Sequence, residues 1–116
     1  MTNRRDAAIR DTERLIETAK ELHAALRATE AVYRKTLKKL KQDTSISEVL
    51  SDVQAENARK ELNDALEALE HGRHQARLAL TAAGLEEGMA VSDTGRAWGF
   101  SRQLADRYAK EARGEE

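Results

Sequence analysis

Residues 91–110 read VSDTGRAWGFSRQLADRYAK, and this stretch decides the fold. Two short helices that cross closely need a small residue at the crossing, and Gly95 meets that need. The turn between the helices needs a residue that tolerates positive φ, which Gly99 supplies four residues later. Apolar Trp98 and Phe100 flank this turn and are expected to fill the wedge between the helices. The pattern predicts a helix-turn-helix, in which two short helices pack against each other.

The second helix of this unit is predicted to begin after Ser101, because serine is a favourable N-cap residue. Ala105, Tyr108 and Ala109 follow at spacings of three and four, so they share one face of that helix. We expect this face to turn back onto the rest of the unit.

The opposite face of the second helix is polar. Arg102 and Gln103 stand in its first turn, and the N-terminal residues of a recognition helix are those that contact base edges. Arginine pairs bidentately with guanine, and glutamine with adenine. The remaining cations are expected to contact phosphate, although Lys110 equally suits the negative C-terminal end of a helix. The candidate DNA-binding residues are Ser101, Arg102, Gln103, Arg107, Arg96 and Lys110.

The run GFSRQ, followed by Ala105 and Tyr108, closely resembles the recognition end of bacterial helix-turn-helix regulators. The wider stretch 85–113 is similar to sigma-factor region 4 and to actinobacterial and phage regulators with a C-terminal helix-turn-helix. The resemblance implies a sequence-specific DNA-binding protein that reads the major groove with the helix Arg102–Arg113. Two residues differ from the family pattern: Thr94 replaces a branched aliphatic residue, and Asp106 brings a negative charge to the outward face.

The composition is that of long solvated helices. Charged residues make up 35% of the 116 residues and aromatic residues 3%, and neither proline nor cysteine occurs. The lack of cysteine excludes disulfides, catalytic thiols and thiolate metal sites. No apolar run approaches the length of a membrane span, and no signal-peptide core follows Met1. We therefore expect a cytoplasmic protein with no membrane association.

The first part of the chain is predicted to be one helix over residues 4–42. Apolar and small residues recur there in alternating steps of three and four, as in a coiled-coil seam. They are Leu15, Ala19, Leu22, Leu26, Thr29, Tyr33, Thr36 and Leu40, with Ile16, Ala25, Val32 and Leu37 widening the stripe.

A second helix is predicted over residues 46–86. Ser45 and Glu48 form a capping box at its start, and Gly88 is favoured over Gly84 as its end. The short connection makes the two long helices antiparallel. Charge supports this register, because residues 1–41 carry eleven Lys/Arg against six Asp/Glu, whereas residues 42–70 carry two against eight.

The expected fold is all-α, a long antiparallel helical hairpin followed by a C-terminal helix-turn-helix. The hairpin is assigned to residues 1–75, the helix-turn-helix unit to 76–113 and a disordered tail to 114–116. A homodimer through the hairpin is expected, because one thin two-helix contact cannot cover all of the leucines on the two stripes. These leucines are Leu22, Leu26, Leu62, Leu66 and Leu69.

Other chemistry finds little support in the sequence. His71 and His74 lie near Glu67 and Glu70, but solvated Glu–His pairs explain them better than a metal site. No phosphate loop or catalytic constellation is recognisable, so we expect no enzyme activity, cofactor or metal.

The main prediction is a DNA-binding transcriptional regulator. The alternative is a scaffold or interaction module that uses the hairpin and the crossed helices on a protein partner, for example in the transcription machinery. Arg4 and Arg5 could form a minor-groove arm or a plain basic N-terminus.

Overall fold

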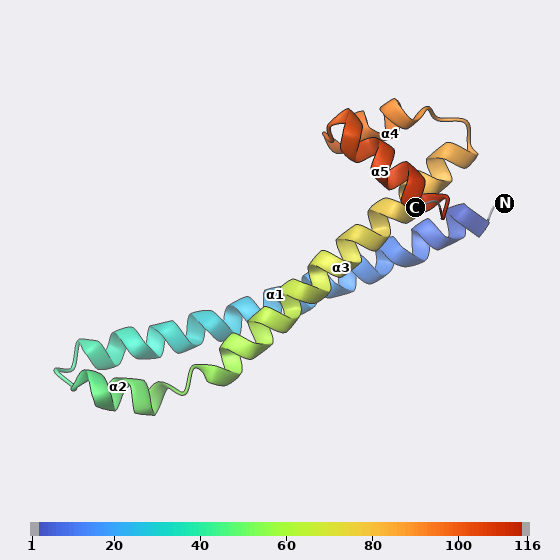
Figure 1. Cartoon of the computed structure of the whole chain (residues 1–116). Coiled ribbons are helices and arrows are strands. Elements are labelled where there is room, and N and C mark those ends of the chain that lie inside the picture. The colour runs from blue at the N-terminus through green and yellow to red at the C-terminus, as the bar shows by residue number, and fades with distance from the viewer. Residues whose placement is uncertain (1–2, 115–116) are drawn as a thin grey trace. The chain divides into compact units, whose positions relative to one another are not determined.

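The structure, a computed structural model, describes residues 3–114, and all of its regular elements are helices. Five helices follow in order: α1 (Asn3–Leu40), α2 (Ile46–Val53), α3 (Glu56–Glu86), α4 (Val91–Trp98) and α5 (Arg102–Ala112) (Figure 1). No strand occurs within residues 3–114. The predicted all-α fold, a helical hairpin followed by a helix-turn-helix, is confirmed. None of the described helices is long and apolar enough to cross a membrane.

The chain forms two compact units. One contains residues 17–69, which are the later part of α1, all of α2 and the first part of α3. The other brings residues 3–16 together with residues 70–114, and so contains α4 and α5. In the predicted tail, Glu115 and Glu116 lie outside the described residues.

Small residues hold the unit of residues 17–69 together. Ala25 of α1 and Ala65 of α3 are only 6% and 8% exposed. Lys39 pairs with the Asp52 carboxylate at 3.1 Å, and Lys35 donates to the Asp52 carbonyl at 3.3 Å. These contacts join the basic end of α1 to the acidic start of the returning chain, as the charge pattern predicts. Ser45 caps α2 as predicted, since its hydroxyl accepts a hydrogen bond from the Glu48 amide at 3.2 Å.

The prediction of one continuous helix over residues 46–86 is wrong in one place. The helix is interrupted after Val53, where Gln54 adopts a left-handed conformation with φ of 49°. The apolar pattern explains the break, because the step from Val53 to Ala58 is five residues, and residues five apart do not share a helix face. The interruption resets the phase, so that Val53 and Ala58 are both partly buried.

The predicted seam of α1 also needs correction. Leu26, Tyr33 and Leu40 are 47%, 66% and 44% exposed. The other predicted seam positions are half-buried, as expected: Leu15, Ala19, Leu22, Thr29 and Thr36. Beside them, Ala25 is buried and Val32 half-buried, so these two take the inward places of Leu26 and Tyr33. A seam of smaller residues lets the two helix backbones approach more closely, and this explains why the larger side chains remain outside.

Candidate nucleic-acid interface

The α3–α4 connection is built on Gly88. This glycine has φ of 98°, its amide donates to the Leu85 carbonyl at 3.1 Å, and the Met89 amide donates to the Gly84 carbonyl at 2.9 Å. The two bonds form a Schellman motif, a common way to end a helix with glycine in the left-handed region. The prediction that Gly88 rather than Gly84 terminates the helix is confirmed.

The crossing of α4 and α5 depends on Gly95. A Cβ atom built on this residue would lie 2.4 Å from the Cβ of Ala105, which is too short for a contact between non-bonded carbon atoms. Ala105 itself is only 2% exposed. Gly99 follows with φ of 73°, and the Phe100 amide donates to the Gly95 carbonyl at 2.8 Å, which closes a second Schellman motif. The predicted roles of both glycines are confirmed.

Thr94 fits the same crossing region without strain. Its side chain is 5% exposed, and its hydroxyl donates to the Val91 carbonyl at 2.7 Å. Its methyl carbon lies 3.6 Å from the point where a Cβ of Gly84 would stand. The hydroxyl is therefore satisfied locally, and the methyl group takes the place of the branched aliphatic side chain of the family pattern.

The N-terminus and inward face of α5 are as predicted. The Ser101 hydroxyl accepts a hydrogen bond from the Leu104 amide at 3.2 Å. Ala105 and Ala109 are 2% and 0% exposed, and Tyr108 is half-buried. Because its hydroxyl serves as the N-cap, Ser101 mainly orients α5, and its own availability to a ligand is reduced.

Contacts with α3 orient the C-terminal half of α5. His74 of α3 lies with Nε2 2.8 Å from a Glu111 carboxylate oxygen and Nδ1 3.2 Å from the Tyr108 hydroxyl. From α1, the Arg4 guanidinium donates to the Ala112 carbonyl at 3.4 Å near the end of α5. Arg5 forms an ion pair with Glu87. In this structure both N-terminal arginines therefore contact their own chain, in place of a free arm.

The aromatic residues of the turn are arranged differently from the prediction. Trp98 is 40% exposed instead of filling the wedge. Gly95 and Ala105 touch too closely to admit an indole between the helices, so Phe100 occupies the inner position and is half-buried. Phe100 stacks on Tyr108 with ring centroids 5.0 Å apart, and Trp98 lies beyond it at 6.4 Å from the Phe100 centroid.

Arg77 of α3 completes this aromatic cluster. Its guanidinium carbon lies 5.7 Å from the centroid of Trp98 and 5.3 Å from that of Phe100, within the range of a cation–π contact. Its Nε atom is buried and has no hydrogen-bond partner among the described residues. The sequence contained no signal for this contact, or for the His74–Glu111 pair, because each joins segments more than twenty residues apart.

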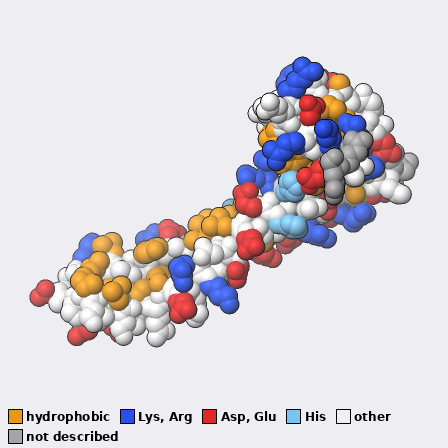
Figure 2. All heavy atoms as spheres, in the orientation of Figure 1, with side chains coloured by type: hydrophobic (Ala, Val, Ile, Leu, Met, Phe, Trp, Pro, Cys, Tyr) orange, Lys and Arg blue, Asp and Glu red, His pale blue; other side chains and the backbone are white. Residues whose placement is uncertain are grey.

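The outward face of α5 brings the sequence-predicted residues together. Arg102, Gln103, Arg107 and Lys110 are all exposed, and they follow one another at helical spacing together with exposed Asp106. None of these five side chains has a hydrogen-bond or ion-pair partner within residues 3–114. Figure 2 shows Lys and Arg side chains over the visible face of the α4–α5 part, with acidic side chains among them.

Arg96 stands apart from this set on α4. Its side chain is 77% exposed and makes only a long contact of 3.4 Å with Asp93. It therefore remains accessible to a phosphate. In the described part of the chain, no group of three or more His, Asp or Glu side chains could hold a metal ion.

Comparison of the chain with protein-family models, with curated proteins and with solved structures finds no match. The assignment of a function therefore rests on the geometry of this face and on its chemistry.

Proposed function

We propose that this chain is a non-enzymatic, sequence-specific DNA-binding protein, a transcriptional regulator, that reads the major groove with α5. The observation that carries the proposal is the outward face of α5, where Arg102 and Gln103 occupy the first turn, exposed and without a hydrogen-bond or ion-pair partner in residues 3–114. Eleven residues give α5 a length of about 16 Å. The major groove, about 12 Å wide, admits a helix of this kind.

The residues on this face divide into two roles. Arg102 and Gln103 have the chemistry to read guanine and adenine, and Asp106, one turn later, can accept a hydrogen bond from the cytosine amino group. Arg107, Lys110 and Arg96 supply positive charge for phosphate contacts, which position a protein on DNA without reading sequence. The positive charge is local, since the whole chain carries a net charge of −1. Binding should therefore depend on this face.

The proposal includes a homodimer formed through the helical hairpin. A dimer carries two copies of α5, and regulators with this motif commonly bind two half-sites one helical turn apart. A regulator of bacterial type acts in the cytoplasm, where its DNA is found. No cofactor is required for binding of this kind.

The test is binding to DNA selected from a random library. Arg102→Ala and Gln103→Ala should each weaken binding to the selected site by about 1–3 kcal/mol and relax its sequence preference. Arg107→Ala should weaken binding to all sequences equally, and should lower the slope of log K against log salt by about 1. Arg14→Ala is the matched control, because Arg14 is an exposed arginine on α1 of the same unit. This control removes the same charge and should change binding little.

The second candidate is a module that binds another protein. It is favoured by the large apolar side chains that remain exposed, including Tyr33 at 66% and Leu50 at 72%. The two candidates differ in their response to salt, because DNA binding weakens steeply as salt rises. A folded wild-type chain that selects no DNA from the library, even at low salt, would exclude the proposed function in favour of a protein partner.

A further inference from the structure

The later part of α1 carries two apolar seams instead of one. The inner seam contains Leu22, Ala25, Thr29, Val32 and Thr36, which are buried or half-buried, and its Ala25, Thr29 and Val32 lie beside residues of α3. The outer seam contains Leu26, Glu30, Tyr33, Leu37 and Leu40, in alternating steps of four and three. Each of the first four outer residues directly follows an inner one in the sequence, so the two seams are about 100° apart around the helix. All five outer residues are exposed.

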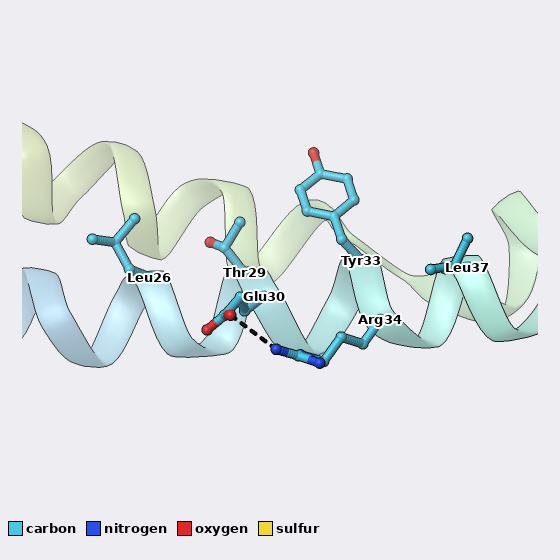
Figure 3. Close-up of a pocket in the computed structure, with 6 residues that line it drawn as sticks. All are labelled: Leu26, Thr29, Glu30, Tyr33, Arg34 and Leu37. Carbon is cyan, nitrogen blue, oxygen red and sulfur yellow. Dashed lines mark hydrogen bonds and ion pairs between the residues drawn. The ribbon is translucent and has the colours of Figure 1, made fainter.

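The outer seam borders an open hollow. Leu26, Tyr33 and Leu37 project from the same side of α1, and they line a hollow of about 510 Å³ that the Glu30–Arg34 ion pair borders (Figure 3). Tyr33 also lines a second, smaller hollow together with Leu62 of α3. The open face therefore extends from α1 to α3.

The apolar content of this unit is large for an uncovered surface. Figure 2 shows apolar side chains gathered over the later part of α1. Seven large apolar side chains in residues 17–69 are 43–72% exposed. They are Leu26, Tyr33, Leu37, Leu40, Ile46, Leu50 and Leu66. Monomeric proteins rarely leave an apolar patch of more than a few hundred Å² uncovered. A standard protein interface covers roughly 800 Å² per partner around such an apolar centre.

Helix geometry indicates what kind of partner fits. In a four-helix bundle each helix contacts two neighbours, and therefore needs two adjacent seams. Within the described unit of residues 17–69, α1 buries its inner seam and leaves the outer seam exposed. A partner that offers a pair of helices with a matching open face would complete the bundle, and a second copy of residues 17–69 offers such a pair.

The charges of the unit favour a second copy over a strongly charged partner. Residues 17–69 carry nine Lys/Arg against ten Asp/Glu, so two copies do not repel each other. A two-fold contact places the same patch of each copy against the other, so any charged groups on the patch must include both signs if they are to pair. The Glu30–Arg34 pair at 3.1 Å gives the edge of the hollow both signs.

We infer that the outer seam of α1, with the adjacent face of α3, is the surface on which a second copy of this chain docks. The inference rests on the homodimer in the proposed function, and it specifies the interface. It differs from the sequence-based expectation, because Leu22, Leu62 and Leu69 are half-buried within one chain, whereas Leu26 and Leu66 remain exposed. Tyr33 and Leu37, 66% and 52% exposed, are the central residues of the seam.

The test is the solution mass of the full chain and of two variants, Tyr33→Glu and Leu37→Glu, measured by sedimentation across micromolar concentrations. Because both side chains are exposed in the single chain, the variants should keep its helical circular dichroism. The wild-type chain should have the mass of two 13.0 kDa chains. Each variant should raise the dimer dissociation constant by roughly 100-fold or more, because it places two unpaired charges in the interface.

The matched control is Ile9→Glu. Ile9 lies on the same helix and is 49% exposed, close to the value for Leu37, but it belongs to the other compact unit. This variant should remain dimeric. A wild-type chain that stays at 13.0 kDa would overturn the inference, as would seam variants that stay dimeric or an Ile9→Glu variant that dissociates as readily.

DNA binding measured on the same samples separates this inference from the proposed function. The wild-type chain can be a dimer that the seam variants dissociate and yet select no DNA. That result supports the inference and refutes the proposed function. A wild-type monomer that selects DNA refutes the inference and the dimer in the proposed function, and it supports sequence-specific DNA binding by the single chain.

Discussion

Replacement of Gly95 by alanine tests the close crossing of α4 and α5 most directly. The added methyl carbon would lie 2.4 Å from the Cβ of Ala105 and 3.6 Å from its Cα. Carbon atoms pack best at about 3.5–4.0 Å, so α5 must move away from α4 by on the order of 1 Å. The obstacle is the Cβ of an alanine, which has no rotatable bond that could relieve the contact.

The magnitude follows from two opposing effects. Overpacking of a buried site costs about 1–3 kcal/mol. Alanine in a helix is favoured over glycine by about 1 kcal/mol, which offsets part of that cost. At a contact this short the steric cost should exceed the gain, and we expect Gly95→Ala to lower the free energy of unfolding by about 1–2 kcal/mol.

Gly84→Ala provides a matched control. There the nearest atom to an added Cβ is the Met89 sulfur at 2.9 Å, at the flexible part of a long side chain. Met89 is 42% exposed and can change rotamer, so the helical preference for alanine should prevail. The expected effect is between no change and a gain of about 1 kcal/mol.

Urea unfolding of both variants can be followed by fluorescence, because Trp98 is the only tryptophan and lies at the end of α4. Far-UV circular dichroism of the same samples reports the helices as a whole. A Gly95→Ala variant as stable as the wild type, or a Gly84→Ala variant that is the less stable of the two, would contradict a close crossing at Gly95.

Three further predictions concern single contacts. Ser101→Ala removes the N-cap of α5 and should cost about 1 kcal/mol in urea unfolding; an unchanged midpoint would contradict the cap. Gln54→Gly should raise stability by about 0.5–1 kcal/mol in a thermal melt, because glycine adopts the left-handed conformation without strain, and a loss of stability would argue against the break. Trp98→Ala should cost about 2 kcal/mol rather than the 3–5 kcal/mol of a fully buried aromatic residue, since the ring is 40% exposed, and a melt that shows the larger loss would contradict this exposure.

Features fixed by local chemistry could be predicted from the sequence. Ser45 and Ser101 cap helices, Gly88 and Gly99 adopt positive φ, and Gly95 lies at a crossing. Each role depends on the residue itself and on neighbours within a few positions, so the pattern of residue types contains the information.

Features that depend on which seam is chosen could not be predicted in the same way. The apolar stripe on α1 is wide enough to pack through Leu26 and Tyr33 or through Ala25 and Val32, and periodicity does not distinguish the two. The contact between His74 and Glu111 joins residues 37 positions apart, and it forms only when α5 is already docked on α3. The break at Gln54 could have been found, because the step of five residues before Ala58 is visible in the sequence.

The distribution of large and small side chains connects the two halves of the proposal. The buried apolar side chains of the described chain are six alanines and Val49, whereas nine of its leucines and isoleucines are 38–72% exposed. Burial of a CH₂ group contributes about 0.8 kcal/mol, so an alanine interior stabilises a single chain far less than its leucines would if they were covered. Small residues at the α4–α5 crossing fix the position of α5 by close contact, while the large residues on α1 remain available for association. If a second copy covers them, much of the stability of the hairpin comes from the dimer, and the proposed DNA-binding protein carries two copies of α5.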